Sequence, residues 1–271
     1  MFRTRLISGI VLVAIALALI IPGGPVLLAG LLVISVIGMF ELYRATGLIA
    51  KDAPEGPAIA GFAGAVAMYV LLLAHQEEYL MVCAALTTCA LLAVYVFSWP
   101  KVKASGVATA LFGMFYVAVM LSYIYQTRSL PGGQFLVWLI FFCSWGSDTC
   151  AYCVGMLIGK HKMSPKLSPK KSIEGAIGGV AGAALLGSLY VWIVRGGMPE
   201  GFQVYYGAII CASGALISIV GDLAASAIKR EHKIKDYGNL IPGHGGILDR
   251  FDSVIITAPI IWLLSKLLLG A

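Results

Sequence analysis

The chain has 271 residues, of which 60% are hydrophobic and only 12% are charged, and its mean hydropathy is +0.93. This composition excludes an ordinary soluble domain, because apolar runs of this length are what a helix needs to cross a bilayer core of about 30 Å. Alternating segments of roughly 10 residues, typical of transmembrane barrels, are absent from the sequence, and the net charge of +6 fits membrane topology rather than nucleic-acid binding.

The apolar runs predict an all-α fold, a polytopic transmembrane helical bundle of about nine spans. In chain order we expect spans over residues 7–21, 25–44, 57–75, 78–97, 105–126, 133–158, 173–194, 203–228 and 252–269. The first span is short and basic at its start, but no small-residue cleavage site follows it, so we expect a retained helix. We divide the bundle into residues 1–130, a scaffold and dimerisation candidate of five spans, and residues 131–271, four spans with the catalytic loops.

The basic residues predict the orientation of this bundle. With nine spans and a cytoplasmic N-terminus, 16 of the 19 Lys and Arg residues fall on the cytoplasmic side. Ten of the 16 lie in two loops, residues 159–172 and 229–250. We therefore expect an integral protein of the inner (cytoplasmic) membrane, with a polar cavity that faces the cytoplasm and two loops there that bind an anion.

The loop before the seventh span has features of a phosphate site. Ser172 can cap the following helix, and Glu174 lies in its first turn, where a carboxylate suits the helix dipole. Lys170 and Lys171 precede this helix start, a favourable place to hold phosphate, although a lysine cluster that only sets topology is the alternative. Two pairs of glycines at small-xxx-small spacing predict close helix packing: Gly175 with Gly179, and Gly178 with Gly182.

The sixth span contains an acidic residue far from its end. Ser144, Asp148 and Tyr152 recur every four residues and are expected to share one face. Asp148 lies about eleven residues from the helix end, hence roughly 16 Å deep at 1.5 Å per residue. A carboxylate at that depth faces a polar cavity or a partner, so Asp148 is a site candidate, with an interhelix hydrogen bond or ion pair as the alternative.

Three further carboxylates flank the second basic loop. Asp222, Ser226 and Lys229 share one face at the end of the eighth span, and Asp249 and Asp252 lie one turn apart at the start of the ninth. The cations around them are Lys229, Arg230, Lys235 and Arg250. Oxygen ligands hold Mg²⁺, and cations hold phosphates bridged by that metal. The pattern predicts a magnesium and phosphate site at Asp222, Asp249 and Asp252. For Asp252, capping the last helix or fixing Arg250 is the alternative.

The stretch "SAIKREHKIKDYGNLIPGHGGILDRFD", residues 226–252, resembles the signature S-x-φ-K-R-x4-K-D-x-G-x2-φ-P-x-H-G-G-φ-x-D-R-φ-D of the phosphatidate cytidylyltransferases, or CDP-diacylglycerol synthases. The stretch "SPKKSIEGAIGG", residues 168–179, is similar to the family's second motif, with Ser172 where Thr is usual. Together the motifs cover roughly residues 144–252. The glycines Gly243, Gly245 and Gly246 also suggest that the backbone turns tightly there.

The resemblance implies a nucleotidyltransferase that converts CTP and phosphatidate into CDP-diacylglycerol and pyrophosphate in phospholipid biosynthesis. It also implies Mg²⁺ at Asp222 and Asp249, leaves open a second, monovalent cation such as K⁺, and suggests a homodimer. The expected catalytic residues are Asp222, Lys229, Arg230, Lys235, His244, Asp249 and Arg250. The expected substrate-binding or cofactor-binding residues are Asp148, Lys170, Lys171, Ser172, Ser226, Gly245 and Gly246.

Two other functions fit parts of the pattern. A CTP-dependent polyprenol or phytol kinase would use similar substrates, but the full signature argues against it. A cation-coupled transporter could use Asp148 and Asp222 as intramembrane ion sites, yet the inverted repeats and broken helices that support such a function are not seen in the sequence.

Overall fold

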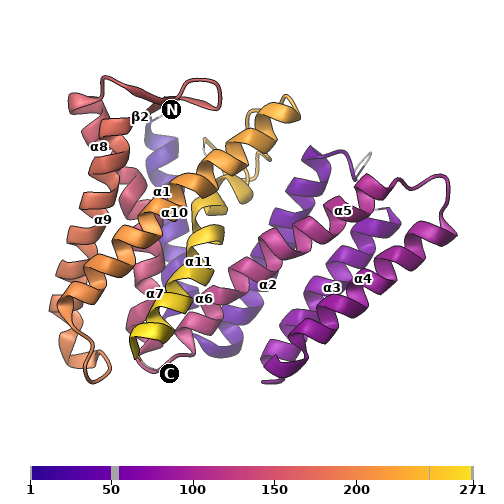
Figure 1. Ribbon diagram of the computed structural model, residues 1–271, viewed down its shortest axis with the longest axis horizontal. Coiled ribbons are helices and arrows are strands. Elements are labelled where there is room, and N and C mark those ends of the chain that lie inside the picture. The colour runs from indigo at the N-terminus through magenta and orange to yellow at the C-terminus, as the bar shows by residue number, and fades with distance from the viewer. Residues whose placement is uncertain (1, 50–54, 244, 270–271) are drawn as a thin grey trace. The chain divides into compact units, whose positions relative to one another are not determined.

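The computed structural model describes residues 2–49, 55–243 and 245–269, with side chains from residue 7 onward. Eleven α-helices make up most of the described chain, and Figure 1 shows how they follow one another along the chain. They are α1 (Phe2–Ile20), α2 (Gly24–Ala45), α3 (Gly56–Leu73), α4 (Leu80–Phe97), α5 (Ala104–Gly113), α6 (Met120–Arg128), α7 (Gly133–Phe141), α8 (Ser147–Ile158), α9 (Ile173–Val194), α10 (Val204–Glu231) and α11 (Leu248–Leu269). The prediction of an all-α polytopic bundle is confirmed.

Eight helical segments of the described chain are long and apolar enough to cross a membrane. Each coincides with one expected span, and α1 adds a shorter apolar helix over Ile7–Ile20. Four of these spans contain more than one element. The short 3₁₀ helix η1 (Glu77–Tyr79) leads into α4, the 3₁₀ helix η4 (Arg195–Gly197) follows α9, and two π-helical turns join α5 to α6 and α7 to α8. The chain is therefore an integral membrane protein. The side of the membrane that the loops face stays a prediction.

The two π-helical turns were not predicted from the sequence. They are η2 (Met114–Val119) and η3 (Phe142–Gly146). A π-turn changes the direction of the side chains that follow it, and such turns are frequent at functional sites. The predicted common face of Ser144, Asp148 and Tyr152 is consequently wrong for Ser144. That side chain is fully buried and its Oγ donates to the Ile140 carbonyl, whereas Asp148 and Tyr152 are exposed.

The loop between α8 and α9 contains a β-hairpin. Strand β1 (Lys162–Ser164) pairs antiparallel with β2 (Ser168–Ser172), and in Figure 1 the hairpin lies beyond the adjoining ends of α8 and α9. Ser172 then caps α9, since its Oγ accepts the Gly175 N–H at 3.1 Å, as predicted. Glu174 holds the base of the hairpin, because its carboxylate accepts the His161 N–H and lies 2.5 Å from His161 Nδ1.

The described helices form two compact units. The first comprises residues 1–122 and 232–250, and the second comprises residues 123–231 and 251–271. The expected division into residues 1–130 and 131–271 stays a prediction. The two compact units differ from it, because residues 232–250 belong to the same unit as the N-terminal helices.

The first unit has a core of large side chains packed against glycines. Tyr43 of α2 is fully buried, and its hydroxyl donates to the Ala110 carbonyl of α5 at 2.6 Å. A Cβ at Gly61 or Gly113 would collide with the Tyr43 ring, so α3 and α5 can approach α2 only where they lack a side chain.

The second unit packs α8, α9 and α10 through small residues. A Cβ at Gly179 would lie 2.9 Å from Ala151 Cβ and 3.0 Å from the Ser147 carbonyl oxygen. Gly178 and Gly182 are likewise pressed against Val154 and Cys150. The predicted role of these glycines in close helix packing is confirmed. This packing brings the end of α8, the hairpin and the start of α9 together.

Candidate active site

The second unit joins a residue of the hairpin to a residue of α10. Lys171 Nζ forms an ion pair with Asp222 Oδ2, and the two side chains are 29% and 22% exposed. Strand β2 ends at Ser172, which places Lys171 beside the helix start, while α10 carries Asp222 about two turns before its end. The sequence singled out these two residues separately, as a phosphate ligand and a metal ligand, and the structure brings them into contact.

A second acidic group of the same unit lies at the start of α11. Asp252 is 7% exposed, and its Oδ1 accepts the Ser253 N–H at 2.8 Å. The Ser253 hydroxyl lies 3.2 Å from Asp148 Oδ2 and 3.3 Å from Asp252 Oδ1. Because a serine hydroxyl has one proton to donate, it serves one carboxylate at a time. When the Ser253 hydroxyl donates to Asp148, it forms the interhelix hydrogen bond between α11 and α8 that was considered for Asp148.

Asp252 also interacts electrostatically with three other charged groups of this unit. These groups are Asp148, Asp222 and Lys229. The helices come close here, since a Cβ at Gly221 would lie 3.0 Å from the Asp252 carbonyl oxygen. Three carboxylates from α8, α10 and α11 are thus neighbours in a region with two lysines, Lys171 and Lys229. We call these five side chains the acidic–basic cluster.

The acidic–basic cluster has oxygen donors of the kind that Mg²⁺ prefers. Within the described residues, no three Asp, Glu, His or Cys side chains are gathered closely enough to hold a metal by themselves. Magnesium is commonly bound by one or two carboxylates, with waters and substrate phosphates as the other ligands. Asp222 and Asp252 therefore fit Mg²⁺ in the presence of a phosphate substrate, by the chemistry of their side chains.

The first unit contains the remaining part of the signature, the loop before α11. Asp249 is 5% exposed, and its Oδ2 accepts the N–H of Tyr237 at 2.7 Å and that of Gly246 at 3.0 Å. Gly243 and Gly245 have φ angles of +79° and +84°, which L side chains rarely adopt. The predicted tight turn is present, and it folds back on the carboxylate of Asp249.

One buried residue of this loop region was missed in the sequence. Glu41 of α2 is 6% exposed, and its two carboxylate oxygens accept the N–H groups of Ile247 and Leu248 at 3.0 and 2.8 Å. A Cβ on Gly238 or Gly246 would collide with this carboxylate. The signal was available, because an acidic residue inside an apolar span is costly and has a partner. Spacing alone could not identify a partner about 206 residues away.

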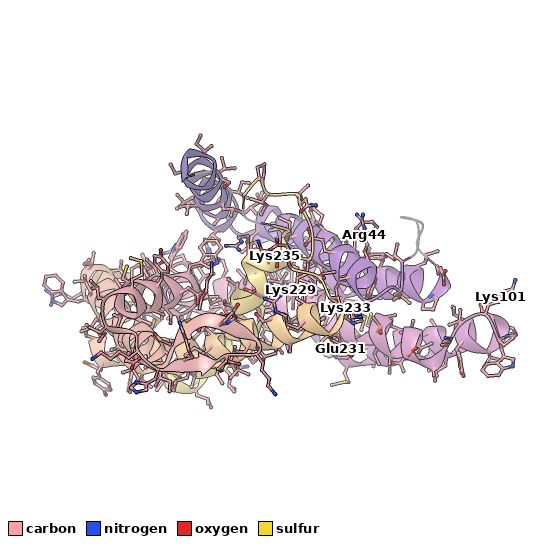
Figure 2. The ribbon with its side chains drawn as sticks, turned by 90° about the horizontal axis from the view of Figure 1, so that it is seen from above. Arg44, Lys101, Lys229, Glu231, Lys233 and Lys235 are labelled. Atoms are coloured by element: carbon pink, nitrogen blue, oxygen red, sulfur yellow. The ribbon has the colours of Figure 1, made fainter. Side chains whose placement is uncertain are left out.

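The other predicted site residues lie near the end of α10, in the loop that follows it, in β2 and at the start of α11. Lys229 and Arg230 belong to the last turn of α10, and Ser226 is buried one turn earlier. Figure 2 shows Lys229 and Glu231 on the end of α10, with Lys233 and Lys235 on the chain that follows. Lys170 and Lys235 are exposed, Arg250 is half-buried in the first turn of α11, and His244 lies outside the described residues.

Comparison with known proteins gives a consistent result over nearly the whole chain. The profile of the "Cytidylyltransferase family" matches residues 3–268. The chain is 31% identical to the phosphatidate cytidylyltransferase of Synechocystis sp., over 98% of this chain and 97% of that protein. It is 28% identical to the Bacillus subtilis protein of the same name, over 98% of both chains, and 32% identical to that of Brucella suis, over 96% and 92%. The chain belongs to the cytidylyltransferase family.

Proposed function

We propose that this chain transfers the cytidylyl group of CTP to phosphatidate, which gives CDP-diacylglycerol and pyrophosphate. The relatives with full coverage, all phosphatidate cytidylyltransferases, support this reaction. The structural observation that carries it is the Lys171–Asp222 ion pair, set among further charges at the ends of apolar helices. Such a place suits a reaction between a soluble triphosphate and a lipid phosphate.

The reaction needs little help from a general base. A phosphate monoester has a second pKa near 6, so phosphatidate presents an anionic oxygen at neutral pH. That oxygen attacks the α-phosphorus of CTP and forms the new P–O bond, while the bond from the α-phosphorus to the bridging oxygen breaks. Its electron pair leaves with pyrophosphate. The protein therefore contributes mainly position and charge.

The acidic–basic cluster can supply both the positioning of the substrates and the compensating charge. Lys171 and Lys229 would hold phosphate oxygens, which their places beside Asp222 and Asp252 support, and Lys170 lies next to the start of α9. Asp222 and Asp252 would hold Mg²⁺, which when bound neutralises charge on the triphosphate and on the leaving pyrophosphate. The roles of Asp249 as a metal ligand, of His244 and of a K⁺ ion stay predictions.

We also propose that the protein works as a homodimer in the inner membrane, with residues 159–172 and 229–250 facing the cytoplasm. The excess of Lys and Arg in these loops supports the orientation, and the family resemblance supports the dimer. The acyl chains of phosphatidate can then remain in the bilayer while its headgroup reaches the charged groups at the helix ends.

The experiment uses purified protein in liposomes that contain phosphatidate, phytol or a polyprenol. CTP is labelled either at the α-phosphorus or at the γ-phosphorus. We expect α-label in the lipid extract only with phosphatidate, and γ-label in the released pyrophosphate. Transfer of γ-label to phytol or polyprenol would identify a kinase instead, and no transfer of either label would refute both enzyme functions.

A further inference from the structure

The start of α11 is held by a carboxylate from a distant helix. The first N–H groups of an α-helix have no partner within the helix, and a nearby Ser, Thr, Asp or Asn side chain usually satisfies one of them. Here the residue before α11 is Ile247, which has no polar side chain. Glu41 accepts the N–H groups of Ile247 and Leu248 through Oε1 and Oε2, at 3.0 and 2.8 Å.

The contact is buried and closely packed. Glu41 is 6% exposed, and all of its partners named here belong to the same compact unit. A Cβ at Gly238 or Gly246 would collide with the Glu41 carboxylate, so the loop can reach it only where it carries glycine. Two of the glycines of the signature, Gly238 and Gly246, are thereby explained by an acidic side chain outside the signature.

Three consecutive N–H groups before and at the helix start point to two carboxylates. The Gly246 N–H donates to Asp249, and the next two donate to Glu41. Asp249 and Arg250 follow directly in the first turn of α11. Because the direction of a helix is set by its first turn, the position of Glu41 decides where these two side chains lie.

We propose that Glu41 is a positioning residue for cytidylyl transfer, which fixes the start of α11 and so the placement of Asp249 and Arg250. The inference rests on the proposed function. Both oxygens of a carboxylate accept hydrogen bonds, whereas the amide of glutamine has one accepting oxygen and an NH₂ group that donates. Glu41→Gln therefore keeps the volume of the side chain but turns a donor toward one backbone N–H.

The first test compares Glu41→Gln with Ser35→Ala in the reconstituted enzyme. Ser35 is fully buried on the same helix, and its hydroxyl lies 2.8 Å from the Tyr69 hydroxyl of α3. Both variants lose buried hydrogen bonds of α2, so loss of packing alone should affect them similarly. We expect Glu41→Gln to lower kcat at least tenfold per folded molecule, with KM for phosphatidate within twofold of wild type. Ser35→Ala should keep kcat within twofold.

The second test measures backbone hydrogen exchange in a peptide that covers residues 245–250. Glu41→Gln should speed exchange of the Ile247 and Leu248 amides, and Ser35→Ala should not. Should Glu41→Gln not fold, Glu41→Asp is measured in its place. That variant keeps the charge but is shorter by one methylene. We therefore expect a smaller loss of kcat than in Glu41→Gln and a smaller increase in the exchange rate of the two amides.

The outcomes separate this inference from the proposed function. If the wild-type protein transfers no α-label, the proposed function fails, while the exchange experiment still reports on the contact. If the wild type is active and the Glu41 variant has the kcat of Ser35→Ala, Glu41 does not position the reaction. Unchanged exchange at both amides would show that the carboxylate does not hold the helix start.

Discussion

The Lys171–Asp222 ion pair predicts that stability and activity respond differently to the same substitutions. Lys171→Met removes the charge and keeps most of the aliphatic chain. Asp222→Asn removes the opposite charge with nearly the same shape. Breaking a fully buried pair by removing one partner costs about 3–5 kcal/mol, because the other charge is left uncompensated.

The exposure of the two groups reduces this cost. Their side chains are 29% and 22% exposed, so water partly screens the charge that remains. We therefore expect Lys171→Met to lower the free energy of unfolding by about 1–2 kcal/mol. Asp222→Asn should cost less, because the lysine ammonium can extend to solvent. The double variant should recover to within about 0.5 kcal/mol of wild type, since no unpaired charge is left.

Activity should not recover in the double variant. Each of the three variants lacks a charge that the cluster needs for phosphate or Mg²⁺, so we expect kcat/KM for CTP to fall about a hundredfold, or roughly 2.7 kcal/mol. Melting can be followed with a thiol-reactive dye, because Cys143 and Cys211 are free and buried. A double variant as unstable as Lys171→Met would refute the reasoning on charge. A Lys171→Met enzyme with kcat/KM within threefold of wild type would remove Lys171 from the phosphate site.

Further predictions concern packing, capping, topology and the metal. Gly179→Val should destabilise the contact of α8 with α9 by about 1–3 kcal/mol, whereas Gly196→Val, where a Cβ would meet nothing within 4 Å, should not change the melting temperature. Ser172→Ala should cost about 1 kcal/mol through the lost cap of α9, and equal melting temperatures would contradict that role. On a cysteine-free background, an impermeant thiol reagent should label Gly196→Cys but not Pro165→Cys in intact cells, and the reverse would overturn the proposed orientation. Chelation of divalent ions should abolish transfer of α-label and added Mg²⁺ should restore it, so transfer that persists in chelator would exclude the metal.

The amino-acid sequence determined the features that depend on neighbours along the chain. Hydropathy identified each membrane span, since crossing a bilayer requires about 20 consecutive apolar residues. The cap by Ser172 and the glycine packing faces of α9 followed from positions one turn apart. The charged stretch before the last span likewise marked the loop that carries the family signature.

Only the tertiary structure decided which distant groups meet. Lys171 pairs with Asp222, and Glu41 reaches a helix start about 206 residues further on, contacts that no local spacing contains. The π-turn before α8 also separated Ser144 from the face of Asp148, because one extra residue in a turn rotates everything after it. In an apolar bundle a polar group is stable only where another element supplies its partner. The sequence shows that such groups exist, and the packing of the helices selects their partners.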